Sequence, residues 1–158
     1  MAENAVNAAV LYSGEFTYGV ENRRAQVPSK WLPADFDPKI RPVEFSVIVW
    51  AKSVHGICLR VMTREKMDEL IGQLNAMPSS DPRKGKLKRM IGRDSTQVQV
   101  DKQGRILLPD AMAQAAGITD RAVFVGLLDR FEIWNPERNT AQRGAESAEA
   151  LDMLSMLE

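Results

Sequence analysis

The 158-residue sequence contains very few of the side chains that build most metal and redox sites. It has one cysteine, Cys58, and one histidine, His55. An intramolecular disulfide is therefore impossible, and a zinc site of Cys and His ligands within one chain is nearly so. There is also no P-loop and no Gly-rich dinucleotide turn, and the scattered carboxylates form no recognisable acid–base pair. We therefore expect no catalysis, no metal and no cofactor.

Long hydrophobic runs are also missing. No stretch approaches the roughly eighteen consecutive apolar residues of a membrane span. Residues 1–10 contain no Lys or Arg and lack the basic and apolar regions of a secretory signal. The content of 44% hydrophobic and 27% charged residues is typical of a soluble globular protein. We expect no contact with membranes, no export, and a cytoplasmic location whose reducing conditions suit the single cysteine.

An excess of either charge is absent as well, because 21 basic side chains balance 21 acidic ones. Zero net charge weakly disfavours nucleic-acid binding. The distribution is nevertheless uneven, since residues 137–158 carry five acids against two arginines and residues 83–93 carry six bases and no acid. The six bases are Arg83, Lys84, Lys86, Lys88, Arg89 and Arg93.

The most informative feature that is present is an internal echo. Arg24-Ala-Gln-Val-Pro28 and Arg105-Ile-Leu-Leu-Pro109 each place an Arg four residues before a Pro, after a short alternating stretch. Alternation around polar turn residues predicts a β-hairpin in each copy. The predicted hairpins have strands at 16–20 and 25–27 around a connection at 21–23, and strands at 98–100 and 105–108 around a turn at 101–104.

A short helix and a second strand pair are expected after each hairpin. Ser29 is expected to cap the first short helix, whereas Asp110 lies in the first turn of the second and Gly117 ends it. The second strand pairs are predicted at 43–50 with 57–61 and at 122–127 with 131–134. The order strand, strand, short helix, strand, strand therefore occurs twice.

Two more helices are predicted between the halves. Thr63 can cap the first, and Asp81-Pro82 can open the second, whose outer face is basic. The tail from residue 139 is polar at first and becomes Ala- and Leu-rich over 148–157. It is expected either to form a terminal helix or to fray.

The second half carries the motif Val100-Asp-Lys-Gln-Gly-Arg-Ile-Leu-Leu-Pro109, followed by Gly126 and Phe131-Glu-Ile-Trp134. It closely resembles the second repeat of the MraZ family. Gly14-Glu-Phe-Thr17 and 24–31 resemble the first repeat, so that the likeness covers roughly residues 12–138. The first turn departs from the family pattern, because it is one residue shorter and has Arg23 where Gly is usual.

The resemblance implies an α+β, mainly β fold, in which two tandem AbrB-like swapped-hairpin repeats form a pseudo-twofold barrel with intervening helices. It divides the chain into an N-terminal extension (1–11), a first repeat with its helix (12–80), a basic helix (81–93), a second repeat (94–138) and a C-terminal tail (139–158).

The resemblance also implies a sequence-specific DNA-binding transcriptional regulator. Such a protein binds direct repeats in double-stranded DNA upstream of the division and cell-wall gene cluster, including its own promoter. It is expected to be nucleoid-associated, to assemble into a homo-oligomeric ring and to take no small-molecule substrate.

Three alternatives stay open. One is an antitoxin-like or sporulation-type AbrB relative that pairs hairpins between two chains, although a chain that already holds two hairpins argues against it. Another is a structural or protein-interaction ring without specific DNA binding, which zero net charge and the altered first turn favour. An enzyme is the most distant, because no constellation of titratable groups is recognisable.

By motif match, Arg24 and Arg105 are the predicted DNA-binding residues, with Arg23 and Lys102 in support. The planar fork of Arg can pair with guanine O6 and N7, whereas Lys suits phosphate as a mobile point charge. The alternative for each arginine is an ion pair with a nearby acid such as Glu21 or Asp101. A secondary set is predicted to contact DNA or another subunit: Lys30, Arg83, Lys84, Lys86, Lys88 and Arg89. For the helix residues of this set, a solvated outer face is the alternative.

The other conspicuous residues are interpreted structurally. We expect Trp50, Trp134, Phe131 and Met90 to lie in the core or a subunit contact, and Cys58 to be a small buried hydrophobe. His55 is expected to be a loop residue, Gly104 to serve its turn, and Pro28 and Pro109 to end the hairpins.

Overall fold

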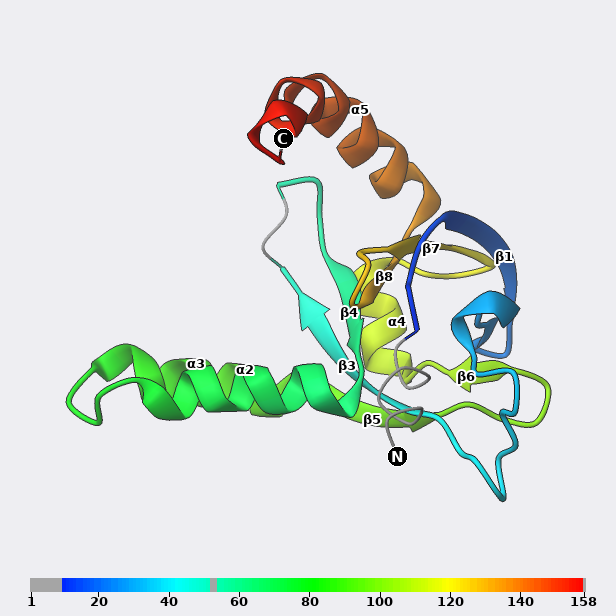
Figure 1. The fold of residues 1–158 in the computed structure, drawn as a ribbon, viewed down its shortest axis with the longest axis horizontal. Helices are drawn as coiled ribbons and strands as arrows, with labels where there is room; N and C mark the ends of the chain where they lie inside the picture. The colour runs from blue at the N-terminus through cyan, green and yellow to red at the C-terminus, as the bar shows by residue number, and fades with distance from the viewer. Residues whose placement is uncertain (1–9, 52–53, 158) are drawn as a thin grey trace.

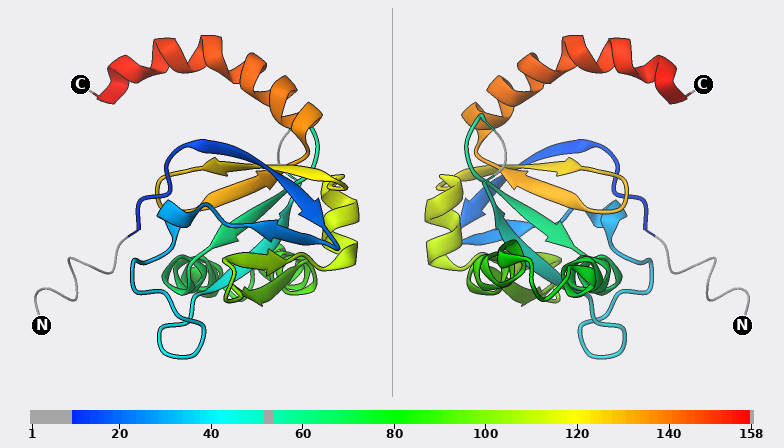
Figure 2. Two further views of the ribbon diagram at one scale, coloured as in Figure 1. Left: turned by 90° about the vertical axis from the view of Figure 1, so that its right-hand side faces the viewer. Right: turned by 90° about the vertical axis from the view of Figure 1, so that its left-hand side faces the viewer.

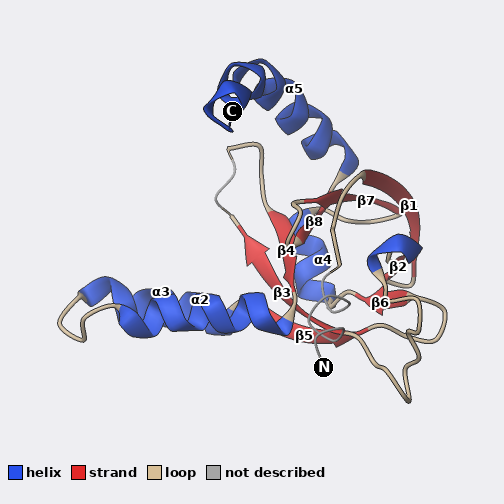
Figure 3. Ribbon diagram, viewed as in Figure 1, coloured by secondary structure: helices blue, strands red, loops and turns tan. Residues whose placement is uncertain are grey.

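The computed structural model describes residues 10–51 and 54–157. Its strands form one antiparallel sheet that curls into a nearly closed barrel, from which a two-helix arm projects and over which a last helix arches (Figures 1 and 2). Figure 3 shows the strands gathered in one body, with the helices outside it. The strands are β1 (Glu15–Glu21), β2 (Arg24–Gln26), β3 (Glu44–Trp50), β4 (Cys58–Met62), β5 (Ser95–Gln99), β6 (Arg105–Leu107), β7 (Arg121–Gly126) and β8 (Phe131–Trp134). The helices are α2 (Arg64–Ala76), α3 (Pro82–Arg93), α4 (Asp110–Ala116), α5 (Pro136–Met153) and the 3-10 helices η1 (Ser29–Trp31) and η2 (Leu154–Leu157).

The sheet confirms the expected pseudo-twofold arrangement of swapped hairpins. Its strand order is β5-β3-β4-β8-β7-β1-β2-β6. Strands of one half border strands of the other: β1 pairs with β7, β3 with β5, β2 with β6 and β4 with β8. If each strand of the first half is replaced by its counterpart in the second half and the reverse, so that β1 becomes β5 and β3 becomes β7, the same four pairs result. Neither half can therefore complete its sheet without the other.

The symmetry axis passes through two strand pairs. In the β2–β6 pair, Ala25 lies opposite Ile106, and both are fully buried. In the β4–β8 pair, Arg60 lies opposite Glu132. The axis therefore passes through an apolar contact inside the barrel, between Ala25 and Ile106, and through a charged pair, between Arg60 and Glu132.

The barrel interior is aromatic. Trp31 is fully buried, its ring centroid is 4.9 Å from that of Phe131, and its indole Nε1 donates a hydrogen bond to the Ser13 carbonyl at 3.0 Å. Because Trp31 belongs to the first half and Phe131 to the second, the core also crosses between the repeats. Burying such large rings together with a satisfied indole N–H stabilises the joint barrel.

The helix-end signals were mostly right. The Thr63 hydroxyl accepts from the Lys66 N–H at 3.3 Å, and the Asp81 carboxylate accepts from the Arg83 N–H at 2.9 Å. Gly117 ends α4 with a φ of 68°. The prediction for Ser29 was wrong: η1 has Pro28 at its N-cap and no side-chain cap, since one 3-10 turn leaves few N–H groups to satisfy.

Of the two outcomes expected for the tail, the structure shows the terminal helix. It begins at Pro136, and Asn135 caps it by accepting from the Arg138 N–H at 3.0 Å. Met90 is 50% exposed, so it lies outside the core, and the subunit contact that was its other expected place stays a prediction. Phe131, Trp134 and Cys58 are buried as predicted. Among the described residues, no helix is both long and apolar enough to cross a membrane.

Candidate nucleic-acid interface

The first hairpin closes with a two-residue turn. Glu21 pairs with Arg24, and the residues between them, Asn22 and Arg23, have φ values of 52° and 62°. Two consecutive positive φ values define a type I′ turn, in which Asn is well tolerated and Arg is not. The two-residue turn accounts for the shorter loop, but it leaves Arg23 at a position where this turn type favours glycine.

Arg23 is held in that conformation by the second repeat. Its Nη1 donates to the Leu108 carbonyl at 2.9 Å, and its own carbonyl accepts from the Leu108 N–H at 2.8 Å. These bonds offset a backbone cost of about 1–2 kcal/mol. The structure therefore gives Arg23 a defined structural role at the junction of the two hairpins.

The second hairpin closes with a three-residue loop. The Asp101 N–H donates to the Arg105 carbonyl at 2.8 Å, and Gly104, with φ 81°, donates to the Asp101 carbonyl at 2.9 Å. A Cβ at Gly104 would lie 2.7 Å from Nε2 of Gln26, so the glycine serves both the turn and the close approach of β2. Lys102 is exposed at the tip of this loop.

Asp101 organises the second loop electrostatically. Its Oδ1 accepts from the N–H groups of Gln103 and Arg105, both at 2.9 Å. Burial works in the opposite direction, but these hydrogen bonds and the positive charges of Arg105 and Arg24 keep the pKa of Asp101 below its ordinary value. The positive charges of both predicted DNA-binding arginines therefore lower the pKa of the same carboxylate.

The central feature is the β2–β6 ribbon, defined as Arg24–Gln26 with Arg105–Leu107. Ala25 and Ile106 point inward, so their neighbours point outward because side chains alternate along a strand. Arg24 lies opposite Leu107, and Arg105 lies opposite Gln26. The arginines are thus diagonal neighbours on one outer face, and such neighbours are about 7–8 Å apart in a ribbon of this kind.

The alternative role predicted for Arg105, an ion pair with Asp101, is present in the structure only as a long and partly exposed contact. Its Nε lies 3.6 Å from Oδ2 of Asp101, both side chains keep about a third of their surface exposed (35% and 37%), and its Nη2 donates to the Gln103 amide oxygen. Nε itself is buried and has no hydrogen-bond partner among the described residues. Arg24 is exposed and makes no ion pair within the described part of the chain. Arg105 is preoriented, whereas Arg24 is free to move.

The secondary set lies elsewhere. Lys30 has its Nζ 5.3 Å from the Phe16 ring centroid, near the start of β1 and away from the turn. The bases of α3 lie on the projecting arm, on the opposite side of the barrel from β2 and β6 (Figure 1). Arg83 is paired with Asp81 at 2.7 Å, and the Lys84 Nζ donates to the Asn75 carbonyl at 3.4 Å. The other three, Lys86, Lys88 and Arg89, are exposed.

Two residues of the ribbon were missed. Gln26 lies opposite Arg105, and its Nε2 donates to the carbonyls of Val27 and Gly104, both at 3.0 Å. Leu107 is 42% exposed and borders a hollow of about 320 Å³ beside β5. The alternation that places Arg105 outward also places Leu107 outward, so the signal was present in the sequence.

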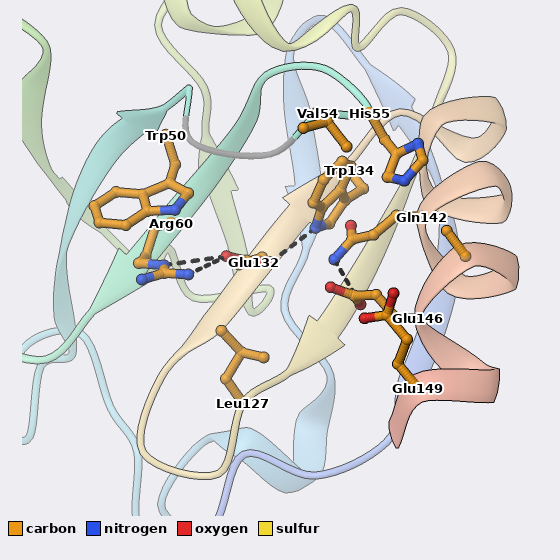
Figure 4. A pocket seen from close by; sticks show the side chains of 11 residues that line it. Trp50, Val54, His55, Arg60, Leu127, Glu132, Trp134, Gln142, Glu146 and Glu149 are labelled. Carbon is orange, nitrogen blue, oxygen red and sulfur yellow. Dashed lines mark hydrogen bonds and ion pairs between the residues drawn. The ribbon is translucent and has the colours of Figure 1, made fainter. Parts of the chain in front are cut away.

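A larger hollow of about 550 Å³ lies between the sheet and α5 (Figure 4). The charged groups that the sheet contributes to this hollow, Arg60 and Glu132, already have hydrogen-bond partners within the chain. The Glu132 carboxylate accepts from Arg60 Nη2 at 2.7 Å and from Trp134 Nε1 at 2.9 Å. Arg60 is also stacked on Trp50, 3.9 Å from the ring centroid. Burial, together with Glu132, raises the pKa of the nearby Cys58 thiol, which stays protonated at neutral pH.

Comparisons with known proteins relate this chain to one family. The family model for the MraZ protein matches residues 91–150. A transcriptional regulator MraZ of Lachnoclostridium phytofermentans is 38% identical over 129 residues, which cover 81% of this chain and 84% of that protein. Namesakes from Thermomicrobium roseum and Leuconostoc citreum are each 28% identical over 142 residues, covering 88% and 90% of this chain and 92% of each relative.

Proposed function

The chain belongs to the MraZ family of transcriptional regulators, and we propose that it binds repeated promoter elements of the division and cell-wall gene cluster, including its own promoter. The observation that carries this proposal is the symmetric placement of Arg24 and Arg105 on the outer face of the β2–β6 ribbon. These two predicted DNA-binding residues belong to different repeats and lie on the same surface.

The ribbon suits the major groove of DNA. That groove admits a two-stranded β-ribbon, and an arginine fork pairs there with guanine O6 and N7. Arg105 contacts Asp101 through a loose ion pair, so a base edge or phosphate can replace that partner at small cost. Leu107 lies opposite Arg24 and offers an apolar contact for a thymine methyl group. Lys102 and Arg23 would add positive charge at the loop tips.

Assembly would make the binding cumulative. Each chain presents one ribbon, and a homo-oligomeric ring would align several ribbons along direct repeats, which raises avidity without new contacts. The working location of such a protein is the nucleoid in the cytoplasm. It would act without catalysis, cofactor or small-molecule substrate.

The test is fluorescence anisotropy of the protein with the DNA upstream of its own gene, against scrambled DNA, over a salt series. Arg24→Ala and Arg105→Ala should each weaken binding by about 1–3 kcal/mol and relax specificity. If either arginine contacts phosphate instead, its removal should flatten the salt slope by about one unit and weaken all sequences alike. Arg64→Ala, an exposed arginine on α2, is the matched control.

A chain with no preference for its own promoter at low salt would contradict the proposal. The structural or protein-interaction ring would then be the better explanation. Unchanged binding by both arginine variants, with selective binding by the wild type, would place the reading surface elsewhere.

A further inference from the structure

The outer side of α3 carries a row of positive charges. Lys86, Arg89 and Arg93 follow one another at intervals of three and four residues, so they share one side of the helix, and all three are exposed. These three residues are here called the α3 stripe. Leu87 and Ile91, which are partly buried, lie on the opposite side of the helix. The α3 stripe therefore faces solvent.

The charge of the α3 stripe is not compensated within the described part of the chain. The helix contains no acid, and no residue of the stripe makes an ion pair there. Other bases of the same arm are paired: Arg64 lies 3.3 Å from Asp68, and Arg83 lies 2.7 Å from Asp81. A solvated helix face commonly pairs its charges with acids one turn away, as α2 does. The α3 stripe departs from that pattern and leaves its cations available to an external anion.

Two glycines lie beside the α3 stripe. Gly85 and Gly92 are seven residues apart, so they share one side of α3, between Lys88 and Arg89. A Cβ at Gly92 would meet no atom within 4 Å, and a Cβ at Gly85 would lie 3.4 Å from Nη1 of Arg89. No packing among the described residues therefore requires Gly92, although glycine weakens a helix relative to alanine. The bare backbone lets an extended anion approach the helix closely, with a cation on either side.

The phosphate backbone of DNA fits this surface better than a protein does. The stripe is about 10 Å long. A DNA strand carries one phosphate per about 3.4 Å of duplex axis, so roughly two or three phosphates come within reach of the cations. Protein interfaces usually have an apolar centre and a charged rim, whereas here the charges form the centre and the half-exposed Met90 lies at one edge. Contacts of this kind hold DNA without reading its sequence.

The α3 stripe and the β2–β6 ribbon lie on opposite sides of the barrel. The arm projects away from β2 and β6 in Figure 1, and the left view of Figure 2 looks onto these strands with the helices of the arm end-on beyond them. A straight duplex that lies on the ribbon therefore cannot also run along the stripe, because the barrel stands between the two surfaces.

We propose that the α3 stripe binds the phosphate backbone of a second segment of double-stranded DNA, whatever its sequence, while the β2–β6 ribbon holds the promoter repeat. The protein thereby bridges two segments of DNA. Only the binding of the first segment rests on the proposed regulatory function. The binding of the second segment follows from the charge and shape of α3.

The test is a bridging assay with the full-length protein. A scrambled duplex is fixed to beads, and a fluorescent duplex with one promoter repeat is added in solution. The wild type should retain the fluorescent duplex on the beads at low salt, and retention should fall as salt rises. Lys86→Gln with Arg89→Gln should lower retention by about tenfold, since two phosphate contacts are lost. The same variant should bind the promoter duplex alone like the wild type in the anisotropy assay.

The matched control is Arg64→Gln with Arg83→Gln, which removes the same charge from the same arm at two arginines that are already paired. It should bridge like the wild type. Glutamine has a helix propensity close to that of Lys and Arg, so both variants should keep the wild-type Tm. A control that loses as much bridging as the stripe variant would overturn the proposal. So would a stripe variant that bridges normally, because two ribbons of one assembly would then hold both duplexes.

Failure of this inference is distinguishable from failure of the regulatory proposal. Arg24→Ala with Arg105→Ala should abolish the preference for the promoter but keep salt-dependent binding to scrambled DNA. Adding Lys86→Gln and Arg89→Gln should reduce the salt slope of that remaining binding by about two units. An unchanged slope would overturn the role of the stripe and leave the ribbon proposal standing. A wild type without promoter preference, but with binding that depends on the stripe, would contradict the regulatory proposal alone.

Discussion

Removing the charge of Glu132 should destabilise the protein more than most single substitutions. The residue is 4% exposed, and its carboxylate accepts two hydrogen bonds from Arg60, at 2.7 and 3.1 Å, and one from Trp134. In Glu132→Gln the size is kept and Trp134 can retain an acceptor, but the guanidinium stacked on Trp50 loses its counter-charge.

The magnitude follows from the burial of the two partners. Breaking a buried ion pair by removing one charge costs about 3–5 kcal/mol. The Arg60 side chain is 20% exposed, so water partly replaces the lost partner and the lower end of this range applies. We expect a loss of about 3 kcal/mol, which corresponds to a decrease in Tm of roughly 6–12 °C for a chain of this size.

Urea unfolding and calorimetry at one fixed protein concentration would measure this loss. A second variant, Arg60→Met with Glu132→Gln, removes both charges and should recover most of the stability, because no charge is left buried without its partner. A single Glu132→Gln variant within about 1 kcal/mol of the wild type would refute the reasoning. The same holds for a double variant that loses the sum of the two single effects.

Two further outcomes test the packing and the electrostatics. Gly126→Ala should cost about 3 kcal/mol in urea unfolding, because its Cβ would lie 2.3 Å from the Tyr12 backbone oxygen, which cannot move as a side chain can. Hydrogen bonds from Arg130 and then Lys66 hold the pKa of Asp129 at about 2, below the ordinary 3.8. The stabilising contribution of Asp129 is therefore fully present above pH 3.8 and lost as the pH falls through about 2, so Asp129→Asn should show a smaller acid-induced loss of Tm than the wild type over that window.

The sequence was sufficient for the local elements of the fold. The Arg-to-Pro spacing, polar turn residues and alternating strands located both hairpins, and Thr63 and Asp81 located two helix starts. These signals act over a few residues. Ser29 shows their limit, since a capping residue before a single 3-10 turn has almost nothing to cap.

The candidate site was predicted only in part, because its geometry depends on pairing across more than 80 residues. The motifs named Arg24 and Arg105 but did not place them on one ribbon, since that follows from the antiparallel register of β2 with β6. The bond from Arg23 to the Leu108 carbonyl and the pairing of Leu107 with Arg24 depend on the same register. No local pattern contains that information.

The pairing of Arg60 with Glu132 also explains why two unequal repeats within one chain are useful. These residues occupy equivalent positions and face each other across the symmetry axis. In a dimer of identical single repeats, whatever residue stood there would face its own copy, and a charge would meet the same charge. Covalent fusion of the repeats removes this constraint, so an attractive pair can lie on the axis and the two hairpin loops can differ in length. If two copies of the same half paired with each other, like charges would meet at this point. This repulsion favours pairing of the two different halves within one chain over pairing of identical halves from two chains.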